Sequence, residues 1–177
     1  MIRASRVVVC VFDGLRPDFA THERMPALAG FLDRSRVFSE ARTVFPSVTR
    51  VATTSIATGA FPNGHGVVGN AFYYPQVTTK HAIDVSSAAD IALADAHLDG
   101  GFVAADAFGA ALARAGKSVC VVHTGSAGSA YCINPRVADQ NHWTFSMLGE
   151  AHTRTPEAVR EVVERFGPLP ARTLPRF

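Results

Sequence analysis

The 177-residue sequence has few cysteines and little net charge. Its three cysteines, Cys10, Cys120 and Cys132, are odd in number, and two of them lie in apolar runs, where thiols usually pack as small hydrophobic side chains. No disulfide framework is therefore expected. The formal net charge is only +2, and no Lys/Arg run is interleaved with aromatic residues, so we do not expect a nucleic acid polymer as a partner.

Long apolar runs are also missing from the sequence. None approaches the roughly twenty residues that a membrane-spanning helix needs. The apolar run at residues 7–12 is too short for the core of a signal peptide, and it ends at Asp13. We therefore expect a cytoplasmic protein without a membrane segment. The sequence does not fix the oligomeric state, and a homo-oligomer is compatible with it.

Segments typical of strands alternate with segments typical of helices. The β-branched runs at residues 6–12 and 118–123 are typical of strands buried on both faces of a sheet, and residues 37–43 can form a further strand. Apolar spacing and end signals predict helices at residues 26–34, 48–58, 104–115 and 156–166. This alternation predicts an α/β fold with a mostly parallel central sheet flanked by helices.

Three segments give weaker signals. Residues 83–101, rich in Ala and Asp, are expected to form a long surface excursion. The GSAGSA segment at residues 125–130 follows a predicted strand but lacks a suitably spaced lysine for phosphate binding, so a flexible turn is expected. The end, residues 167–177, holds three prolines and is interpreted as a linker or a truncation edge.

Asp13 occupies a position where α/β proteins place their chemistry. It follows the predicted strand at residues 6–12, and functional residues in such folds gather at the carboxyl ends of strands. On an Asp-Gly turn its carboxylate is placed to hold a hard cation or zinc. The alternative is that Asp13 only caps the turn.

The predicted helix at residues 48–58 contains Thr49 in its first turn. Free N–H groups and the helix dipole attract anions there, so a threonine alkoxide or a phosphate would be stabilised. Arg50 is disfavoured by the same dipole unless an anion is usually present, which suggests an anionic substrate. The alternative is that Ser47 or Thr49 is only an N-cap and that Arg50 points to water.

Two segments in combination identify a family. VVVCVFDGLRPDF and FPSVTRVATTSIATGAFPNGHGVVGN, with the strand-to-helix order between them, resemble the type I phosphodiesterase/nucleotide pyrophosphatase branch of the alkaline phosphatase superfamily. The resemblance covers residues 6–74. It matches, in order, Asp13-Gly14-Leu15-Arg16, Thr49, Thr58-Gly59, Pro62, His65-Gly66 and Asn70. It implies an alkaline-phosphatase-like core, of which residues 1–177 are the N-terminal part.

The resemblance also implies roles for three residues. It makes Asp13 a zinc ligand, Thr49 both a zinc ligand and the nucleophile, and Asn70 a donor to a phosphoryl oxygen. Zinc lowers the pKa of a bound hydroxyl, so Thr49 would attack phosphorus and form a phospho-threonine. Two zinc ions normally serve in this family.

The remaining zinc ligands of the family are not found in the sequence. The nearest candidates are Asp139 with His142, and His152, but their spacing does not match the family pattern, and structural roles are expected for both histidines. The segment NHWTFSMLG is interpreted as a polar turn followed by an apolar segment. Arg16 and Asp18 are expected to brace the first turn by pairing, and His65 is expected to anchor a loop rather than act as a base.

The substrate is expected to be a small phosphate ester or a phosphonate. Nucleotide-cleaving relatives usually carry an aromatic residue after the nucleophile; here Arg50 would grip an additional anionic group. Tyr73 or Phe72 would supply a stacking face. Three interpretations remain open: a zinc phosphodiesterase or phosphatase, a phosphonoacetate-hydrolase-like enzyme that cleaves a C–P bond, and a truncated phosphate-binding domain without turnover.

Overall fold

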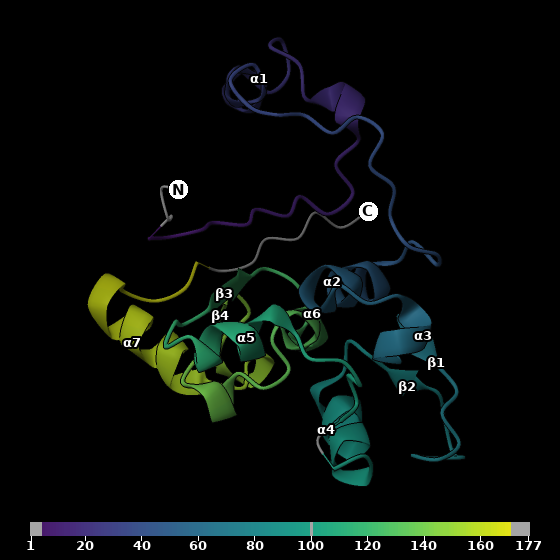
Figure 1. Ribbon diagram of the computed structural model, residues 1–177. Coiled ribbons are helices and arrows are strands. Elements are labelled where there is room, and N and C mark those ends of the chain that lie inside the picture. Colours follow the sequence, from purple (N-terminus) through teal and green to yellow (C-terminus); the bar gives the residue numbers. More distant parts are fainter. Residues whose placement is uncertain (1–4, 100, 171–177) are drawn as a thin grey trace. The chain divides into compact units, whose positions relative to one another are not determined.

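The computed structural model describes residues 5–99 and 101–170 and divides into two compact units, Met1–Arg42 and Thr43–Phe177 (Figure 1). The first unit contains the short 3₁₀ helix Pro17–Phe19 and helix α1. The second unit contains two small sheets and the remaining helices. The helices are α1 (Pro26–Leu32), α2 (Thr49–Thr58), α3 (Pro62–His65), α4 (Ala88–His97), α5 (Phe108–Arg114), α6 (Ala127–Ile133) and α7 (Pro156–Phe166).

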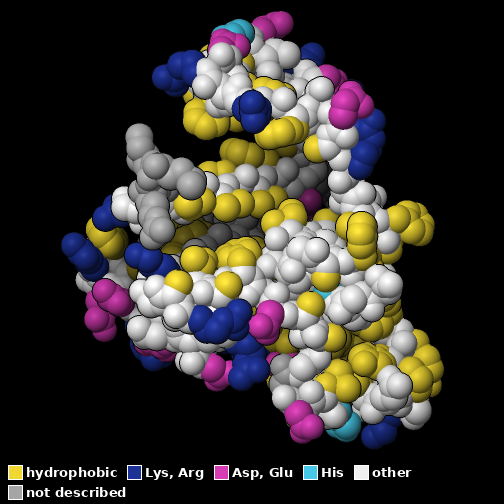
Figure 2. Space-filling model, viewed as in Figure 1, with side chains coloured by type: hydrophobic (Ala, Val, Ile, Leu, Met, Phe, Trp, Pro, Cys, Tyr) yellow, Lys and Arg dark blue, Asp and Glu magenta, His cyan; other side chains and the backbone are white. Residues whose placement is uncertain are grey.

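The predicted central strand at residues 6–12 is not a strand in the structure. The segment follows an extended course (Figure 1) but joins no sheet among the described residues, and the side chains of Val7 and Val8 are 80% and 83% exposed. Hydrophobic side chains are accordingly visible on the surface of this unit (Figure 2). The strand predicted at residues 37–43 is likewise absent from the described residues. β-branched residues favour extended backbone, but a strand also needs a hydrogen-bonding partner.

Two predictions for the N-terminal unit are confirmed. Helix α1 begins with Pro26 at its first position, where the missing N–H has no cost. Arg16 and Asp18 brace the turn after Asp13, because the Arg16 guanidinium donates to both carboxylate oxygens of Asp18 at 2.7 and 3.0 Å.

The second unit is a mixed α/β structure with strands in two pairs. β1 (Ala71–Phe72) and β2 (Ile83–Asp84) are antiparallel, whereas β3 (Cys120–His123) and β4 (Trp143–Ser146) are parallel. The predicted single central sheet is therefore reduced, within the described residues, to one parallel pair and one antiparallel pair. β3 alternates between exposed and buried residues rather than being buried on both faces.

Helix boundaries agree best where a glycine or proline marks them. α2 ends at Gly59 with φ 68°, a left-handed conformation that glycine adopts without strain. α7 begins at Pro156, as predicted. α5 is shorter than the predicted helix at residues 104–115, and its last turn is followed by Gly116 with φ 66°.

Three weakly marked segments prove to be ordered. Residues 83–99 form β2 and α4, and α4 is capped by Ser87, whose hydroxyl accepts the N–H of Asp90. Within the predicted turn at residues 125–130, α6 begins at Ala127, and the segment predicted as a polar turn followed by an apolar segment contains β4. The small residues at positions 125–130 suggested a turn, but in the helix they have a packing role. Gly128 allows α6 to approach the backbone of Val85 closely. Of the predicted linker at residues 167–177, residues 171–177 lie outside the described part.

The core of the second unit brings α2, the β1–β2 pair, α4 and α6 together. Its fully buried side chains include Val51, Val67, Ile83 and Val85. Phe102 stacks on Phe72 with ring centroids 6.1 Å apart and planes at 10°. Burial of each such side chain contributes roughly 1.5–3 kcal/mol to folding.

The three cysteines are free thiols, in agreement with the sequence. The expected packing of Cys10 and Cys120 in apolar surroundings is wrong, because both are exposed. Cys132 on α6 is fully buried, and burial raises its pKa to about 11, so this thiol packs as a small hydrophobic side chain.

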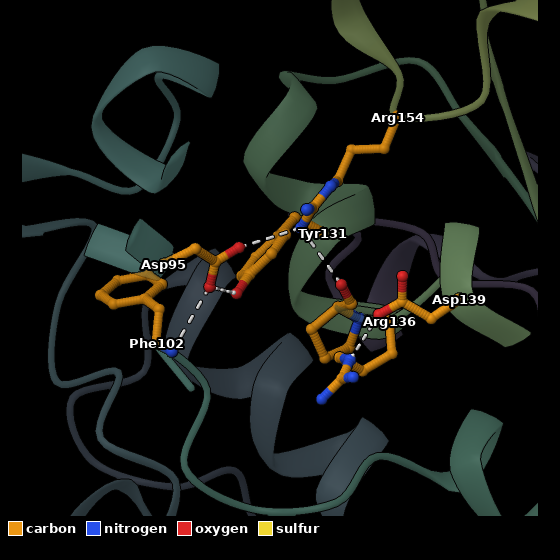
Figure 3. Close-up of polar contacts among 7 residues, drawn as sticks. Asp95, Phe102, Tyr131, Arg136, Asp139 and Arg154 are labelled. Atoms are coloured by element: carbon orange, nitrogen blue, oxygen red, sulfur yellow. Dashed lines mark hydrogen bonds and ion pairs between the residues drawn. The ribbon is translucent and has the colours of Figure 1, made fainter. Parts of the chain in front are cut away.

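A polar network holds α6 against α4 and the segment before α7 (Figure 3). Tyr131 on α6 donates its hydroxyl to Asp95 on α4 at 2.7 Å, and the guanidinium of Arg154 donates to the same carboxylate at 3.0 Å. Burial and the adjacent carboxylate raise the pKa of Tyr131, so the phenol stays a donor. Because charged hydrogen bonds in partly buried positions are strong, the network fixes the position of α6.

The close approach of α6 to Val85 predicts the effect of Gly128→Ala. A Cβ at residue 128 would overlap the carbonyl group of Val85, so backbone must move. We expect the substitution to lower the free energy of unfolding by roughly 1–3 kcal/mol in thermal or urea unfolding. Gly64→Ala is the matched control, since its Cβ would meet only Ala60 at an ordinary 3.5 Å. Equal stability of the two variants would contradict this packing.

Candidate active site

The start of α2 is capped by a residue distant in sequence. Val48 occupies the N-cap position and has no side-chain oxygen to accept a hydrogen bond, and Thr49 is the first helical residue. The backbone N–H of Arg50 donates instead to Oδ1 of Asn70 at 3.1 Å. A side-chain oxygen in this role satisfies one of the free N–H groups of the first turn. The structure thus brings the predicted residues Thr49 and Asn70 to one place.

This hydrogen bond fixes the orientation of the Asn70 amide. A backbone N–H can only donate, so the amide oxygen of Asn70 must face Arg50, and the amide nitrogen keeps its two N–H donors for other partners. The backbone carbonyl of Asn70 accepts the N–H of Val85 at 2.9 Å, which ties the residue to the start of the β1–β2 pair. Asn70 is therefore held at both its side chain and its backbone.

The side chain of Arg50 lies against α6 and does not point only to water. Its Nη2 donates to the hydroxyl of Ser126 at 2.7 Å. The backbone carbonyl of Arg50 accepts the hydroxyl of Thr54 at 2.6 Å within α2. Asp84 is also near: hydrogen bonds from the backbone and side chain of Ser86 hold its pKa below the ordinary value, and the charge of Arg50 lowers it further.

His65 is a structural residue, as predicted. It is fully buried, and its Nδ1 accepts the backbone N–H of Val67 at 3.2 Å, so the proton of the neutral ring resides on Nε2. That nitrogen lies 2.9 Å from the hydroxyl of Ser55. Burial lowers the pKa of His65 and keeps the ring neutral. A histidine that donates to a serine cannot take its proton, so this pair is not a nucleophile and base.

The structure separates the two aromatic candidates for substrate stacking. Phe72 packs on Phe102 in the core, whereas Tyr73 is 59% exposed. Phe72 is the last residue of β1, whereas Tyr73 follows the strand. Of the pair, only Tyr73 offers an accessible ring.

Asp13 belongs to the N-terminal unit, whereas Thr49, Arg50, Asn70 and Tyr73 belong to the second unit. It lies on a turn in which Leu15 N–H donates to the carbonyl of Phe12 at 3.3 Å. Gly14, the next residue, has φ 72° and so gives this turn its shape. The Asp-Gly turn predicted from the sequence is present.

The donors identified for zinc are suitable in kind but too few. Carboxylate and alkoxide oxygens bind zinc, yet a catalytic zinc needs three protein ligands as a rule. Within the described residues no group of three or more His, Cys, Asp or Glu side chains is placed to hold a metal. His142 is buried and contacts Asn134 at 3.0 Å, which fits the structural role expected for it, and Asp139 forms an exposed ion pair with Arg136 at 2.7 Å.

Sequence reasoning missed two features of this site. Ser126, the partner of Arg50, lies in the segment predicted as a flexible turn; the signal was a serine just before the small-residue run AGSA, which marks a helix start. The cap on α2 had no local signal, because Asn70 follows Arg50 by 20 residues.

A helix start that carries a threonine hydroxyl beside an oriented amide is suited to binding and transferring a phosphoryl group. The chain belongs to the type I phosphodiesterase/nucleotide pyrophosphatase family, whose model matches residues 7–166. Proteins of this family hydrolyse phosphate esters. The family predicted from the two N-terminal motifs is thus confirmed.

Curated relatives match a short part of their own length. The bis(5'-adenosyl)-triphosphatase ENPP4 of Mus musculus is 33% identical over 78 residues, 44% of this chain and 17% of the relative. The human ENPP4 is 32% identical over 79 residues, 45% of this chain and 17% of the relative. An uncharacterized pyrophosphatase/phosphodiesterase of Schizosaccharomyces pombe is 34% identical over 80 residues, 45% of this chain and 16% of the relative. The aligned region thus spans about a sixth of each relative.

No solved structure gave a significant match to the chain. In the part of the chain that the structure describes, no helix combines the length and the apolar composition required to cross a bilayer.

Burial of neutral His65 predicts a pH dependence of stability. Its pKa is lowered in the folded state, so the unfolded state binds the proton first as pH falls below the ordinary value of 6.5. The free energy of unfolding should therefore decrease from about pH 7 to about pH 5, and less steeply in His65→Gln. Burial also lowers the pKa of His123, so some slope should remain.

Urea unfolding at several pH values measures this slope. His97→Gln, which removes an exposed histidine near the end of α4, is the matched control. The same slope in His65→Gln and in the unsubstituted protein would contradict the assignment.

Proposed function

We propose that Thr49 is the nucleophile of a metal-dependent phosphodiesterase or phosphatase and that it forms a phospho-threonine intermediate. The observation that carries the proposal is the hydrogen bond from Arg50 N–H to Asn70 Oδ1, since it places an oriented amide beside the helix start that bears Thr49. The family and its nucleotide-cleaving relatives support a phosphate ester of a nucleotide or similar small molecule as substrate.

The proposed reaction has two steps. The Thr49 oxygen attacks phosphorus and loses its proton, the bond from phosphorus to the leaving oxygen breaks, and the leaving oxygen takes up a proton. Water then attacks the phospho-threonine, the Thr49 oxygen departs, and the hydroxyl is restored. In both steps the N–H groups of the Asn70 amide and of the first turn of α2 stabilise negative charge on the phosphoryl oxygens.

Zinc remains part of the proposal through Asp13 and Thr49. A bound zinc ion would lower the pKa of the attacking hydroxyl and neutralise charge on the phosphoryl group. Each of the two residues supplies a single side-chain donor, and a catalytic zinc as a rule needs three protein ligands, so each candidate ligand needs further partners to hold zinc. Two ions are expected in a complete site of this family, and metal analysis together with activity would count them.

Substitutions at Thr49 and Asn70 test the proposal. Thr49→Ala should reduce hydrolysis of bis-p-nitrophenyl phosphate by at least about 10³-fold, because the nucleophile is lost, whereas Thr49→Ser should retain turnover. Asn70→Asp keeps an oxygen for the Arg50 N–H but replaces the donor with a negative oxygen. We expect it to lower kcat by roughly 10²–10³-fold.

Unfolding measurements control for loss of structure. Asn70→Asp should remain close to the unsubstituted protein in stability, because an anion at a helix start is favourable, whereas Asn70→Ala should lose roughly 0.5–2 kcal/mol with the cap. Protein that metal analysis shows to hold zinc and that binds phosphate, yet shows no hydrolysis, would contradict the enzyme proposal and indicate a phosphate-binding domain. Equal turnover in Thr49→Ala would exclude Thr49 as the nucleophile.

The exposed ring of Tyr73 predicts a preference for nucleotides. Stacking on a base is worth roughly 1–3 kcal/mol, so Tyr73→Ala should raise KM for the p-nitrophenyl ester of thymidine 5'-monophosphate about tenfold or more. The KM for methyl p-nitrophenyl phosphate, which has no base, should change little. Tyr73→Phe is the control that keeps the ring. A uniform rise in KM for both substrates would contradict a stacking role.

A further inference from the structure

We infer that Ser126, at the start of α6, is a positioning residue that holds Thr49 and Asn70 in their relative places. The inference rests on the proposed function, but it arises from a separate set of contacts. α6 lies beside α2 and packs against it (Figure 1). At the start of α6, Ser126 contacts Arg50 and Gly128 lies against Val85. Nothing in the two family motifs, which end before residue 75, includes this turn.

The first contact runs through Arg50. The hydroxyl of Ser126 accepts Nη2 of Arg50 at 2.7 Å, while the backbone N–H of Arg50 donates to Asn70 at 3.1 Å. Arg50 follows Thr49 directly, so the backbone N–H and the guanidinium of the residue next to the proposed nucleophile are both held by hydrogen bonds. A charge-assisted hydrogen bond of this length restrains the guanidinium strongly. Movement of the Arg50 side chain would turn the first residues of α2 and with them the Thr49 hydroxyl.

Ser126 bonds to Arg50 in place of the N-cap hydrogen bond that a serine usually makes at a helix start. It occupies the N-cap position of α6, where a serine hydroxyl normally accepts an N–H of its own helix. Here the side chain forms no such capping bond. Its hydroxyl also lies 3.5 Å from that of Ser129, one turn further along α6. The hydroxyl oxygen of Ser126 thus accepts a hydrogen bond from Arg50 of α2 instead of from an N–H of α6.

The second contact runs through Val85 to Asn70. Gly128 of α6 lies directly against the carbonyl of Val85, close enough to exclude a Cβ. The N–H of Val85 donates to the backbone carbonyl of Asn70 at 2.9 Å. The same turn of α6 therefore supports Arg50 through Ser126 and Asn70 through Gly128. Because Tyr131 anchors α6 to Asp95, this turn is a fixed support.

This arrangement changes the role expected of Arg50. Its guanidinium is engaged with Ser126 rather than directed solely at a second anionic group of the substrate. The two roles make different kinetic predictions. A misplaced nucleophile lowers kcat, because displacement of reacting groups by about 1 Å costs up to roughly 10²-fold in rate. Loss of a substrate ligand raises KM instead, and only for substrates that carry the extra anion.

The test is Ser126→Ala with two matched variants. Ser126→Thr keeps the hydroxyl, and Ser129→Ala removes the neighbouring hydroxyl that does not contact Arg50. We expect Ser126→Ala to lower kcat for bis-p-nitrophenyl phosphate about tenfold or more with KM changed less than about twofold. Ser126→Thr should recover most of the rate, and Ser129→Ala should retain it.

A second readout does not depend on activity. Hydrogen exchange of the Arg50 backbone amide, measured by NMR, reports the bond to Asn70, and it should become at least about threefold faster in Ser126→Ala but not in Ser129→Ala. An unchanged exchange rate and kcat in Ser126→Ala would overturn the inference. A rise in KM confined to pyrophosphate-type substrates, with kcat unchanged, would overturn it in favour of Arg50 as a substrate ligand. If Thr49→Ala retains activity, the proposed function fails, while the exchange measurement still decides whether Ser126 positions this turn.

Discussion

The hydrogen bond between the Arg50 N–H and the Asn70 side chain is the constraint on which the candidate site depends. Val48 offers no cap to α2, so the helix start would leave this donor unsatisfied without a residue from another segment. Asn70 satisfies it, and in doing so its amide acquires one orientation. The requirement of a helix for a cap therefore also arranges a donor beside Thr49. Asn70 is thus both the cap of α2 and the proposed donor to a phosphoryl oxygen.

The surroundings of this bond are organised by close approach and by polar networks. Gly128 lets α6 contact the Val85 backbone, and Tyr131 with Asp95 holds that helix in place. Burial lowers the pKa of His65 and keeps its ring neutral, and its Nδ1 accepts the N–H of Val67 in the loop after α3. Titratable groups near the site thus serve mainly to fix the backbone. The proposed nucleophile Thr49 and the amide donors of Asn70 lie on this fixed backbone, and the family to which the chain belongs hydrolyses phosphate esters.

The two units differ in how their apolar residues are used. In the second unit, β-branched residues such as Val51, Val67 and Val85 are fully buried among α2, α4 and α6. In the N-terminal unit, Val7 and Val8 are exposed on an extended segment that pairs with no strand in the part of the chain that the structure describes. An apolar extended segment becomes a stable strand only when another strand pairs with its backbone N–H and C=O groups and another surface buries its side chains. The β-branched composition of a segment therefore shows that it is able to form a strand, but it does not show whether another strand lies beside it.

The sequence by itself determined the family and those structural features that depend on residues close together along the chain. Gly59 and Pro156 marked helix ends, Arg16 and Asp18 could pair across two residues, and the two motifs identified the phosphodiesterase family. Only the tertiary structure decided which strands pair and that Ser126 holds Arg50. Caps and turns are interactions between residues a few positions apart, whereas pairing and interhelical bonds join residues whose separation along the chain carries no signal. Arg50 and Ser126 are 76 residues apart, and only folding could make them partners.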